Sequence, residues 1–382
     1  MKSHQRIRLG VDFHVWDGIF QGSRSHLLGL YRAAITQAPE VDFIFFLDDV
    51  EGLRRSHAEF TAPNVQLVRM PRRPGAWRLL VQLPCLQWRH WLDVLHLQYR
   101  LPPLRWGAVA CTIHDVLFET HPQYFPRGFT WQSRITFRHA ARRAQVLLSV
   151  SAFSKAELVR LYGVAPDRIH ITCNGVDFQR FHPAEAGDEA GLQTVRRLGL
   201  QPGQYILTVG RLEPRKNHAA LVCAYARLGP GAPPLVIVGQ RDFGDQTVFD
   251  EVSRLGLADR VRFLDTVGDQ ALPALMRHAR LFVYPAFAEG FGMPVAEAMA
   301  CGVPVITSNT TSLPEVAGDG ARLVDPHDVA ALHGAMQALL ADPLECQRLI
   351  RLALMQVKQF NWQRSAAVLL NAVRAHIEGA RS

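Results

Sequence analysis

The amino-acid sequence predicts an α/β protein of two domains, each built on a mostly parallel sheet with helices on both faces. Short apolar runs rich in β-branched residues alternate with helix-like segments, which is typical of repeated strand–helix–strand units. Many of these runs are apolar throughout, so both faces of each sheet are expected to be covered. With 382 residues, 48% of them hydrophobic, the chain is long enough for two cores.

Twelve segments are expected to be strands, seven in the first half and five in the second. They are residues 7–12, 41–47, 65–70, 94–98, 109–114, 146–150, 170–173, 205–209, 235–238, 261–264, 281–284 and 303–307. A stretch rich in Ala, Gly, Asp and Glu over 181–191 and a break at 199–203 predict the interdomain linker. The predicted domains are therefore 1–190 and 200–362.

The segment from 362 onward has apolar residues at helical spacing and no strand after it. It is expected to form an amphipathic helix, and the spacing alone leaves open which domain it packs on.

Composition and charge exclude several classes of function. Residues 1–190 hold 23 Lys and Arg against 17 Asp and Glu, and the remainder holds 19 against 17. The first half is therefore expected to meet an acidic acceptor or an anionic membrane surface. Zinc-finger spacing, RNA-binding aromatic motifs and dense basic runs are absent from the sequence, so no nucleic-acid partner is expected.

The expected location is cytoplasmic, with peripheral contact at the inner face of the membrane as an option. The sequence has no signal-peptide-like start, no window of 18 uncharged apolar residues and no Cys-x-x-Cys pair among its six cysteines.

The strongest motif lies in residues 284–304. A strand ending near Tyr284 leads into a loop containing Glu289, Gly290, Phe291 and Gly292, and a helix is expected from about Pro294. The glycines let backbone N–H groups approach a ligand, and the helix start favours an anion, so a phosphate or sugar site is expected here. Glu289 and Glu297 are candidate acceptors for sugar hydroxyls. Glu297 could instead be a solvated helix residue, but its apolar neighbours favour a ligand partner.

A second motif, residues 210–218, follows the strand at 205–209. It carries Arg211 and Lys216, which could bind a diphosphate at the carboxyl edge of a parallel sheet. The chain has four lysines and 38 arginines, so a lysine here is unusual for this composition. The alternative is a solvated basic loop.

Other candidates come from the first half. His114 ends a strand beside Asp115, and it is either functional or a buried, hydrogen-bonded histidine. Gly22 lies in a glycine-bearing loop after the first strand, and Arg24 is a weaker candidate in the same loop. Asp48 and Asp49 lack a third ligand, so no metal site is expected.

Two Ser-x-x-Glu patterns, at Ser154 and at Ser312, predict capping boxes with a structural role only. The preceding Asn309, Thr310 and Thr311 are weak candidates for contact with phosphate or ribose.

Residues 71–106 are basic and aromatic. They predict either a surface that docks on a membrane carrying a lipid-linked acceptor or a core helix with a basic outer face.

At the two motifs the chain resembles the retaining glycosyltransferases of family 4. That family has Gly-Arg-x-x-x-x-Lys-Asn, matched here from Gly210, and Glu-x7-Glu within Glu-Gly-Phe-Gly-x-Pro, matched from Glu289. Further likeness lies at 150–155, 171–177 and 113–115, so it spans nearly the whole chain. The resemblance implies the GT-B fold, in which two Rossmann-like domains face each other across a cleft. It also implies that the C-terminal helix, residues 363–382, returns to the N-terminal, acceptor-side domain.

The resemblance also implies roles for single residues. Arg211 and Lys216 would bind the donor diphosphate and stabilise the leaving group, and Glu297 would accept from the ribose. Glu289, with Gly290, Phe291 and Gly292, would hold the donor sugar. His114 would approach the transferred sugar, and Gly22 would lie near the donor phosphate. The expected catalytic set is therefore His114, Arg211, Lys216 and Glu289, with no metal or other cofactor.

The expected activity is transfer of a hexose from a GDP- or UDP-sugar to a glycan or lipid-linked acceptor in surface-glycan synthesis, with a lean toward mannose. The alternatives are another GT-B enzyme, such as a sugar-nucleotide epimerase or a phosphorylase, and a non-catalytic glycan- or lipid-binding scaffold. A nicotinamide-dependent oxidoreductase is disfavoured, because no Gly-x-Gly-x-x-Gly follows either first strand.

Overall fold

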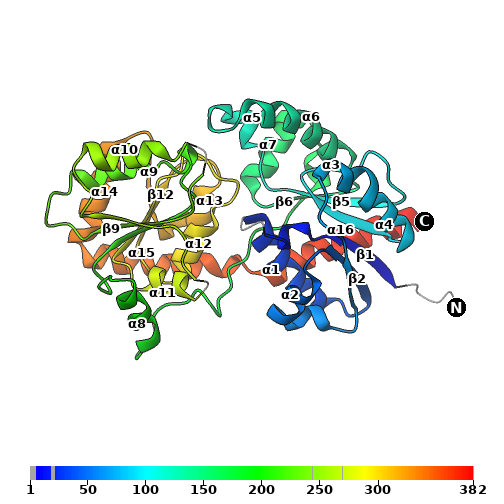
Figure 1. Ribbon diagram of the computed structural model, residues 1–382, viewed down its shortest axis with the longest axis horizontal. Coiled ribbons are helices and arrows are strands. Elements are labelled where there is room, and N and C mark those ends of the chain that lie inside the picture. Colours follow the sequence, from blue (N-terminus) through cyan, green and yellow to red (C-terminus); the bar gives the residue numbers. More distant parts are fainter. Residues whose placement is uncertain (1–5, 19–21, 243, 269, 382) are drawn as a thin grey trace. The chain divides into compact units, whose positions relative to one another are not determined.

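The computed structural model describes residues 6–18, 22–242, 244–268 and 270–381. The chain divides into two compact units, each with one parallel sheet between helices (Figure 1). Unit 1 comprises residues 1–175 and 361–382, and unit 2 comprises 176–360.

Unit 1 contains a seven-stranded parallel sheet in the order β3-β2-β1-β4-β5-β6-β7. Its strands are β1 (Ile7–Asp12), β2 (Val41–Leu47), β3 (Val65–Arg69), β4 (Val94–Gln98), β5 (Ala108–Ile113), β6 (Val146–Ser149) and β7 (Ile169–Ile171). Its helices are α1 (Gly22–Gln37), α2 (Val50–Ser56), α3 (Gly75–Trp77), α4 (Leu83–Arg89), α5 (Leu117–Thr120), α6 (Arg127–Arg143), α7 (Ala152–Tyr162) and α16 (Trp362–Arg381). Two apolar clusters of unit 1 draw on alternating residues of its strands, as expected for a sheet covered on both faces.

Unit 2 contains a six-stranded parallel sheet in the order β10-β9-β8-β11-β12-β13. Its strands are β8 (Ile206–Val209), β9 (Leu235–Val238), β10 (Val261–Leu264), β11 (Leu281–Tyr284), β12 (Val305–Ser308) and β13 (Arg322–Val324). Its helices are α8 (Glu189–Arg197), α9 (His218–Ala226), α10 (Gln246–Arg254), α11 (Ala271–Arg277), α12 (Met293–Ala300), α13 (Leu313–Ala317), α14 (Val329–Ala341) and α15 (Pro343–Gln356). All twelve predicted strands form. The short β13 was not predicted, because it begins with an exposed arginine and so leaves no apolar run.

The helix predicted at the end of the chain forms as α16 and belongs to unit 1. Its apolar stripe is buried in the same cluster as α1, through Ala366, Leu369, Leu370, Val373 and Ile377. In addition, Trp362 packs so closely on Gly29 that a Cβ there would lie 2.1 Å from its ring. The spacing of apolar residues in the sequence does not indicate which domain this helix packs on, and the contacts with α1 show that it packs on unit 1.

The linker prediction differs from the structure. The chain passes into unit 2 after Gly175, so residues 176–200 are part of that unit. Asp188, inside the predicted linker, accepts hydrogen bonds from Arg277 and His278 at 3.1 Å each, and Arg277 also donates to the carbonyl of Arg180. These contacts tie a polar, glycine-bearing segment to α11, which composition alone could not indicate.

The basic and aromatic segment 71–106 contains α3, a π-helical turn (Arg78–Gln82), α4 and β4. Leu83 and Leu92 are buried, as the core-helix interpretation requires. However, large apolar side chains of the same segment are exposed: Trp77, Leu80, Trp88, Trp91, Leu104 and Trp106.

Candidate functional site

The two glycosyltransferase-like motifs follow neighbouring strands of unit 2. β8 pairs with β11, and both run in the same direction, so their carboxyl ends lie side by side at one edge of the sheet. The loop after β8 contains a short 3-10 turn, Pro214–Lys216, and the loop after β11 leads into α12. Ligands of open α/β sheets bind at this edge.

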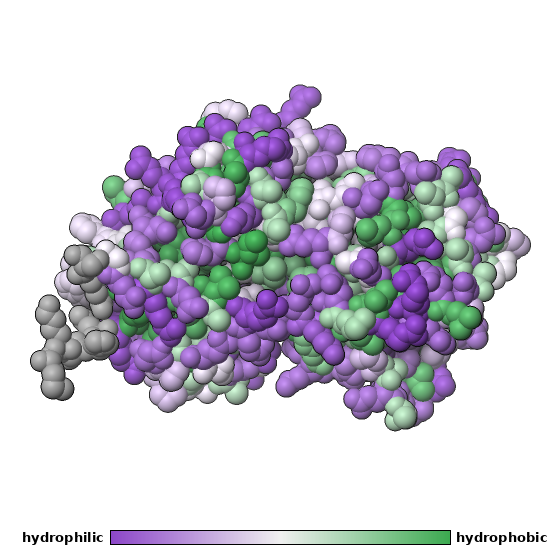
Figure 2. All heavy atoms as spheres, turned by 180° about the vertical axis from the view of Figure 1, so that it is seen from behind, coloured by the Kyte–Doolittle hydropathy of each residue, from purple (hydrophilic) through white to green (hydrophobic). Residues whose placement is uncertain are grey.

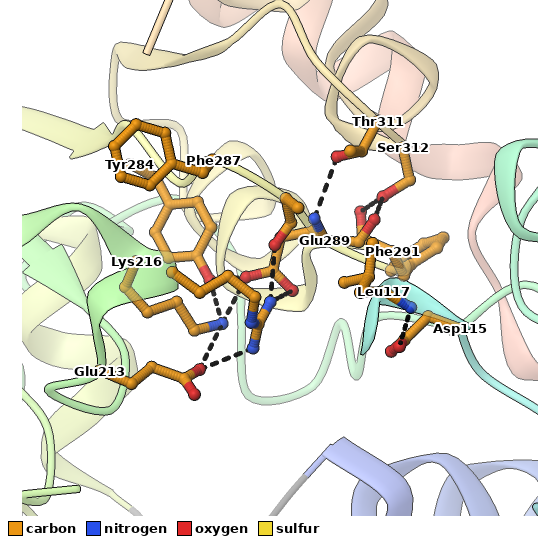
Figure 3. A network of polar contacts seen from close by, with 12 residues as sticks. Asp115, Leu117, Glu213, Lys216, Tyr284, Phe287, Glu289, Phe291, Thr311 and Ser312 are labelled. Atoms are coloured by element: carbon orange, nitrogen blue, oxygen red, sulfur yellow. Dashed lines mark hydrogen bonds and ion pairs between the residues drawn. The ribbon is translucent and has the colours of Figure 1, made fainter. Parts of the chain in front are cut away.

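Lys216 and Glu289, one from each loop, meet in a buried ion pair (Figure 3). The Nζ of Lys216 also donates to the hydroxyl of Tyr284 at 2.8 Å, and that hydroxyl donates to Oε1 of Glu289 at 2.7 Å. Tyr284 is the last residue of β11, so its ring position is fixed by the sheet. The sequence predicted the lysine and the glutamate as site residues but not the tyrosine between them.

Arg215 is a second cation of this network that the sequence did not single out. Its guanidinium donates to the carbonyl of Ala288 at 2.6 Å, contacts Oε2 of Glu289 at 3.1 Å and donates to Glu213 at 2.6 Å. Lys216 therefore contacts Oε1 of Glu289 and Arg215 contacts Oε2, so each oxygen of the carboxylate has its own cation. The position of Arg215 next to Lys216, in a motif already predicted to bind an anion, could have indicated this role from the sequence.

The charges in this network fix the protonation of Glu289. Burial alone would raise the pKa of this carboxyl, but Arg215 and Lys216 lower it to about 2. The pKa of Lys216 is lowered by burial and by Arg215, against the opposite effect of the two glutamates. A buried but fully ionised carboxylate is suited to accept hydrogen bonds from hydroxyl groups.

The loop that carries Glu289 is held by hydroxyl side chains. The backbone N–H of Glu289 donates to Thr311 Oγ1 at 3.0 Å, and Ser312 Oγ donates to the carbonyls of Glu289 at 2.8 Å and Phe291 at 3.0 Å. The capping box predicted at Ser312 is therefore wrong, because this hydroxyl is used by the loop and not by α13.

The other predicted capping box is also wrong. Helix α7 is capped one turn earlier than predicted, by Ser151, whose hydroxyl accepts from the N–H of Ser154 at 3.0 Å.

Gly292 has a local structural reason to be glycine. It lies at the start of α12 with φ of +100°, and a Cβ there would lie 2.6 Å from Leu313. The neighbouring Phe291 is buried against Phe360, with ring centroids 5.3 Å apart. The backbone conformation at Gly292 is therefore one that residues with a Cβ rarely adopt.

Arg211 and Glu297 stand apart from the Lys216 network in the described part of the chain. Arg211 is 39% exposed in its side chain and pairs with Asp242 at 3.0 Å, a residue that follows the neighbouring strand β9. Glu297 is half-buried on α12 and makes no side-chain hydrogen bond to any described residue. Burial raises its pKa to about 7, with Arg180 acting against and Asp177 with that shift.

His114 and Gly22 belong to unit 1. His114 directly follows β5, and its ring packs on those of His26 at 4.8 Å and Tyr99 at 5.1 Å. Burial, with further contributions from His26 and His96, lowers its pKa well below the usual value, so the imidazole is neutral near pH 7. Its Nε2 is buried without a hydrogen-bond partner among the described residues.

Gly22 is the exposed first residue of α1, and residues 19–21 of its loop lie outside the described residues. The guanidinium of Arg24 stacks 4.2 Å above the ring of Trp16. Within the described ranges, no three His, Cys, Asp or Glu side chains gather so as to hold a metal ion.

We expect the Glu297→Gln variant to change stability in a pH-dependent way. Below pH 4.5 the carboxyl is protonated in both the folded and unfolded chain, so the two proteins should be equally stable. Between pH 4.5 and about 7 the unfolded wild type ionises this carboxyl while the folded protein, in which burial raises the pKa, keeps it protonated, so the wild type loses stability over this range. The variant should then gain about 1–3 kcal/mol in free energy of unfolding at pH 8. Urea unfolding of both proteins from pH 4 to 8 measures this, and a difference independent of pH would contradict it.

Comparisons with known proteins agree with these motifs. Residues 20–180 match the family described as Glycosyltransferase Family 4, and residues 196–354 match Glycosyl transferases group 1. The O-antigen chain mannosyltransferase B of Escherichia coli is 36% identical over 278 residues, covering 71% of each chain. The D-inositol 3-phosphate glycosyltransferase of Rhodococcus jostii is 33% identical over 57% of this chain, which spans half of that enzyme's length.

Solved structures show the same architecture. Sucrose-phosphate synthase from Thermosynechococcus elongatus superposes with a TM-score of 0.79 at 21% identity, covering 99% of this chain and all of that one. Anabaena HepE, solved with UDP and glucose, gives 0.75 at 19% identity, covering 97% of this chain and all of that one. On its motifs, its fold and these relatives, the chain belongs to glycosyltransferase family 4 and is a glycosyltransferase with the GT-B fold.

Proposed function

We propose that this enzyme transfers a hexose from a nucleotide sugar to a glycan or lipid-linked acceptor with retention of configuration at the sugar. The observation that carries the proposal is the buried, ionised Glu289 held between Lys216, Arg215 and Tyr284 at the carboxyl edge of the unit 2 sheet. Mannose from GDP-mannose is the preferred donor, because a relative that is 36% identical over 71% of each chain is named a mannosyltransferase. A UDP-sugar is the alternative, since HepE was solved with UDP and with UDP-glucose.

The network suggests how the donor is bound. A diphosphate at this edge competes with Glu289 for the ammonium of Lys216, while Arg215 and Tyr284 keep hold of the carboxylate. Glu289 can then accept from hydroxyls of the transferred sugar. The ammonium of Lys216 at the phosphate stabilises the negative charge that develops there as the glycosyl–phosphate bond breaks. A metal ion has this role in other transferases. In a front-side reaction, the departing phosphate oxygen takes the proton of the attacking acceptor hydroxyl.

The remaining candidates receive supporting roles in this proposal. Arg211 leaves Asp242 to contact the diphosphate, Glu297 accepts from the ribose, and the backbone of Gly290, Phe291 and Gly292 faces the sugar. In unit 1, His114 is assigned to the transferred sugar as a neutral hydrogen-bonding group, and Gly22 to the donor phosphate.

A thermal-shift panel of GDP-, UDP-, ADP- and dTDP-sugars, each with and without chelator, tests the proposal. We expect one nucleotide to raise the melting temperature selectively, because a ligand that binds only the folded protein stabilises it, and we expect the chelator to have no effect. Failure of every nucleotide sugar, or binding that needs a divalent ion, would sink the proposal as stated.

Replacing Lys216 by Ala should lower turnover at least about 100-fold, because the fixed cation at the leaving phosphate is lost. Lys358→Ala removes the other lysine of unit 2, which is exposed and not part of the Glu289 network, and this control should keep wild-type turnover. Steady-state transfer from the donor identified by the panel measures both. Near-normal turnover of the Lys216 variant would remove that residue from the mechanism.

We further propose that unit 1 contacts an anionic membrane surface. The exposed face of α6 carries Trp131, Arg134, Ile135, Arg138 and Arg142, and no acidic residue occurs in that helix. Trp131 is 70% exposed and Ile135 56%, beside a hollow of about 660 Å³ that is lined by four arginines and by Glu119, which pairs with Arg134 at 2.8 Å. Figure 2 shows apolar side chains reaching the surface between polar ones on the face it draws. No helix in the described ranges is long and apolar enough to cross a bilayer.

Co-sedimentation with phosphatidylglycerol vesicles should be roughly tenfold weaker for the Trp131→Ser, Ile135→Ser double variant than for the wild type, because both apolar contacts are lost. Leu344→Ser, at a 76% exposed position on α15, should bind as the wild type does. Equal binding of all three proteins, or equal binding to phosphatidylcholine vesicles, would refute this membrane contact.

A further inference from the structure

The sheet of unit 1 has a topological switch point that the donor site does not use. The chain runs from β1 outward to β2 and β3, and then returns to place β4 on the other side of β1. At such a point the loops after the two central strands diverge, which leaves room for a ligand at their carboxyl ends. The side chains at this point are therefore candidates to bind the acceptor.

On one side of the switch point, β1 ends in Asp12, a buried carboxylate with two partners. His14 Nδ1 lies 3.0 Å from it and Arg78 Nε lies 3.5 Å from it. Arg78 is the first residue of the π-helical turn, a rare geometry that is often found at functional sites. Burial would raise the pKa of Asp12, but these two neighbours lower it, so the carboxylate is charged.

On the other side, a strained residue turns the chain back directly after β4. Tyr99 has φ of +63°, although it is not a glycine, and the N–H of the following Arg100 donates to the carbonyl of Gln98 at 2.7 Å. Backbone strain of this kind tends to occur at binding sites. Here the strained residue, Tyr99, lies directly before Arg100.

Arg100 is a cation without a carboxylate partner among the described residues. Its guanidinium donates to Ser133 Oγ at 3.4 Å and lies 6.0 Å from the ring of Phe137. Its pKa is lowered by burial and by the charge of Arg78. Arg78 has Asp12 as a partner, whereas Arg100 has no carboxylate partner among the described residues, so an added anion would offset the repulsion between the two guanidinium groups.

We propose that Arg78 and Arg100, at the β1–β4 switch point of unit 1, bind a phosphoryl group of the acceptor. The assignment rests on the transferase function proposed above. A phosphoryl group matches two guanidinium forks better than a neutral sugar does, because it offers several charged oxygens. His14, oriented by Asp12, is placed to accept from an acceptor hydroxyl.

The surroundings of Arg78 indicate where that phosphoryl group is attached. Trp77 and Leu80, on either side of Arg78 in sequence, are 53% and 52% exposed. An apolar chain beside the phosphate would cover these two side chains and gain their burial. The structure therefore favours a sugar joined through phosphate to an apolar chain, with a soluble sugar phosphate as the other source of the same group.

The test compares acceptors in steady-state transfer with the donor held at saturation. The wild type is assayed with four acceptors. They are a free mannoside, mannose 1-phosphate, mannose joined through phosphate to a short prenyl chain, and a prenyl glycoside of the uronic acid, which carries a carboxylate in place of the phosphate. We expect the highest kcat/KM for the prenyl phosphate, then the 1-phosphate. The Arg100→Met variant should raise KM for both about 10- to 100-fold, with a smaller change in kcat and no change in KM for the free mannoside.

Matched variants separate binding from folding. Arg100→Lys should recover part of the loss, since it restores the charge without the planar fork. Arg89→Met removes an exposed arginine of α4 and should behave as the wild type does. The donor nucleotide should raise the melting temperature of the Arg100 variants as much as it does for the wild type, which shows that they are folded.

Three results would overturn the inference: unchanged KM in Arg100→Met, equal kcat/KM with and without the phosphate, or preference for the uronic acid. Failure of the proposed function would look different, because the wild type would then bind no nucleotide sugar at all.

Discussion

The site of unit 2 depends on one buried charge, the carboxylate of Glu289. Taking an ion out of water is costly unless opposite charges and hydrogen bonds replace the water. Lys216, Arg215 and Tyr284 supply that replacement, and each is placed by a different part of the fold. The sheet fixes the tyrosine, the 3-10 turn after β8 fixes the two cations, and the adjacency of β8 and β11 brings the loops together. Loss of any of these placements leaves an ion unpaired.

The two units use opposite electrostatic strategies at their sheet edges. In unit 2, carboxylates and cations are nearly matched, so a ligand phosphate has to exchange partners with a residue of the protein. In unit 1, the histidines near β5 are neutral through burial, and the arginines at the switch point outnumber the carboxylates. The first arrangement suits a ligand that must be released after each reaction. The second suits an anion that has little competition within the protein.

Sequence periodicity and motif spacing were sufficient to predict twelve strands, the helix at the end of the chain and the location of Lys216 and Glu289 in loops that follow strands of the same sheet. They succeed because buried parallel strands leave continuous apolar runs, and because both motifs follow strands. Tyr284 and Arg215 were missed because their roles come from the adjacency of β8 and β11, which no local pattern encodes. Ser312 was misread for a related reason: a Ser-x-x-Glu pattern describes a helix start, whereas its hydroxyl is taken by a loop 21 to 23 residues earlier.

The domain boundary shows the same limit of local patterns. Residues 181–191 have the composition of a linker, yet Asp188 is anchored to α11 by Arg277 and His278. Arg211 was predicted together with Lys216, but its side chain pairs with Asp242 after β9. In both cases a long-range ion pair, invisible at the level of composition, determines where the segment lies.

The return of α16 to unit 1 makes unit 2 an insertion in the chain of its neighbour. The backbone N–H of Val176 donates to the carbonyl of Phe360 at 2.9 Å, so the entry and exit segments are joined where they meet unit 2. During synthesis, residues 176–360 leave the ribosome before the helix that completes the core around α1. Unit 1, most of which is translated first, therefore completes its core last. The apolar face of α1 that α16 covers in the folded protein stays exposed to solvent until α16 has been synthesised.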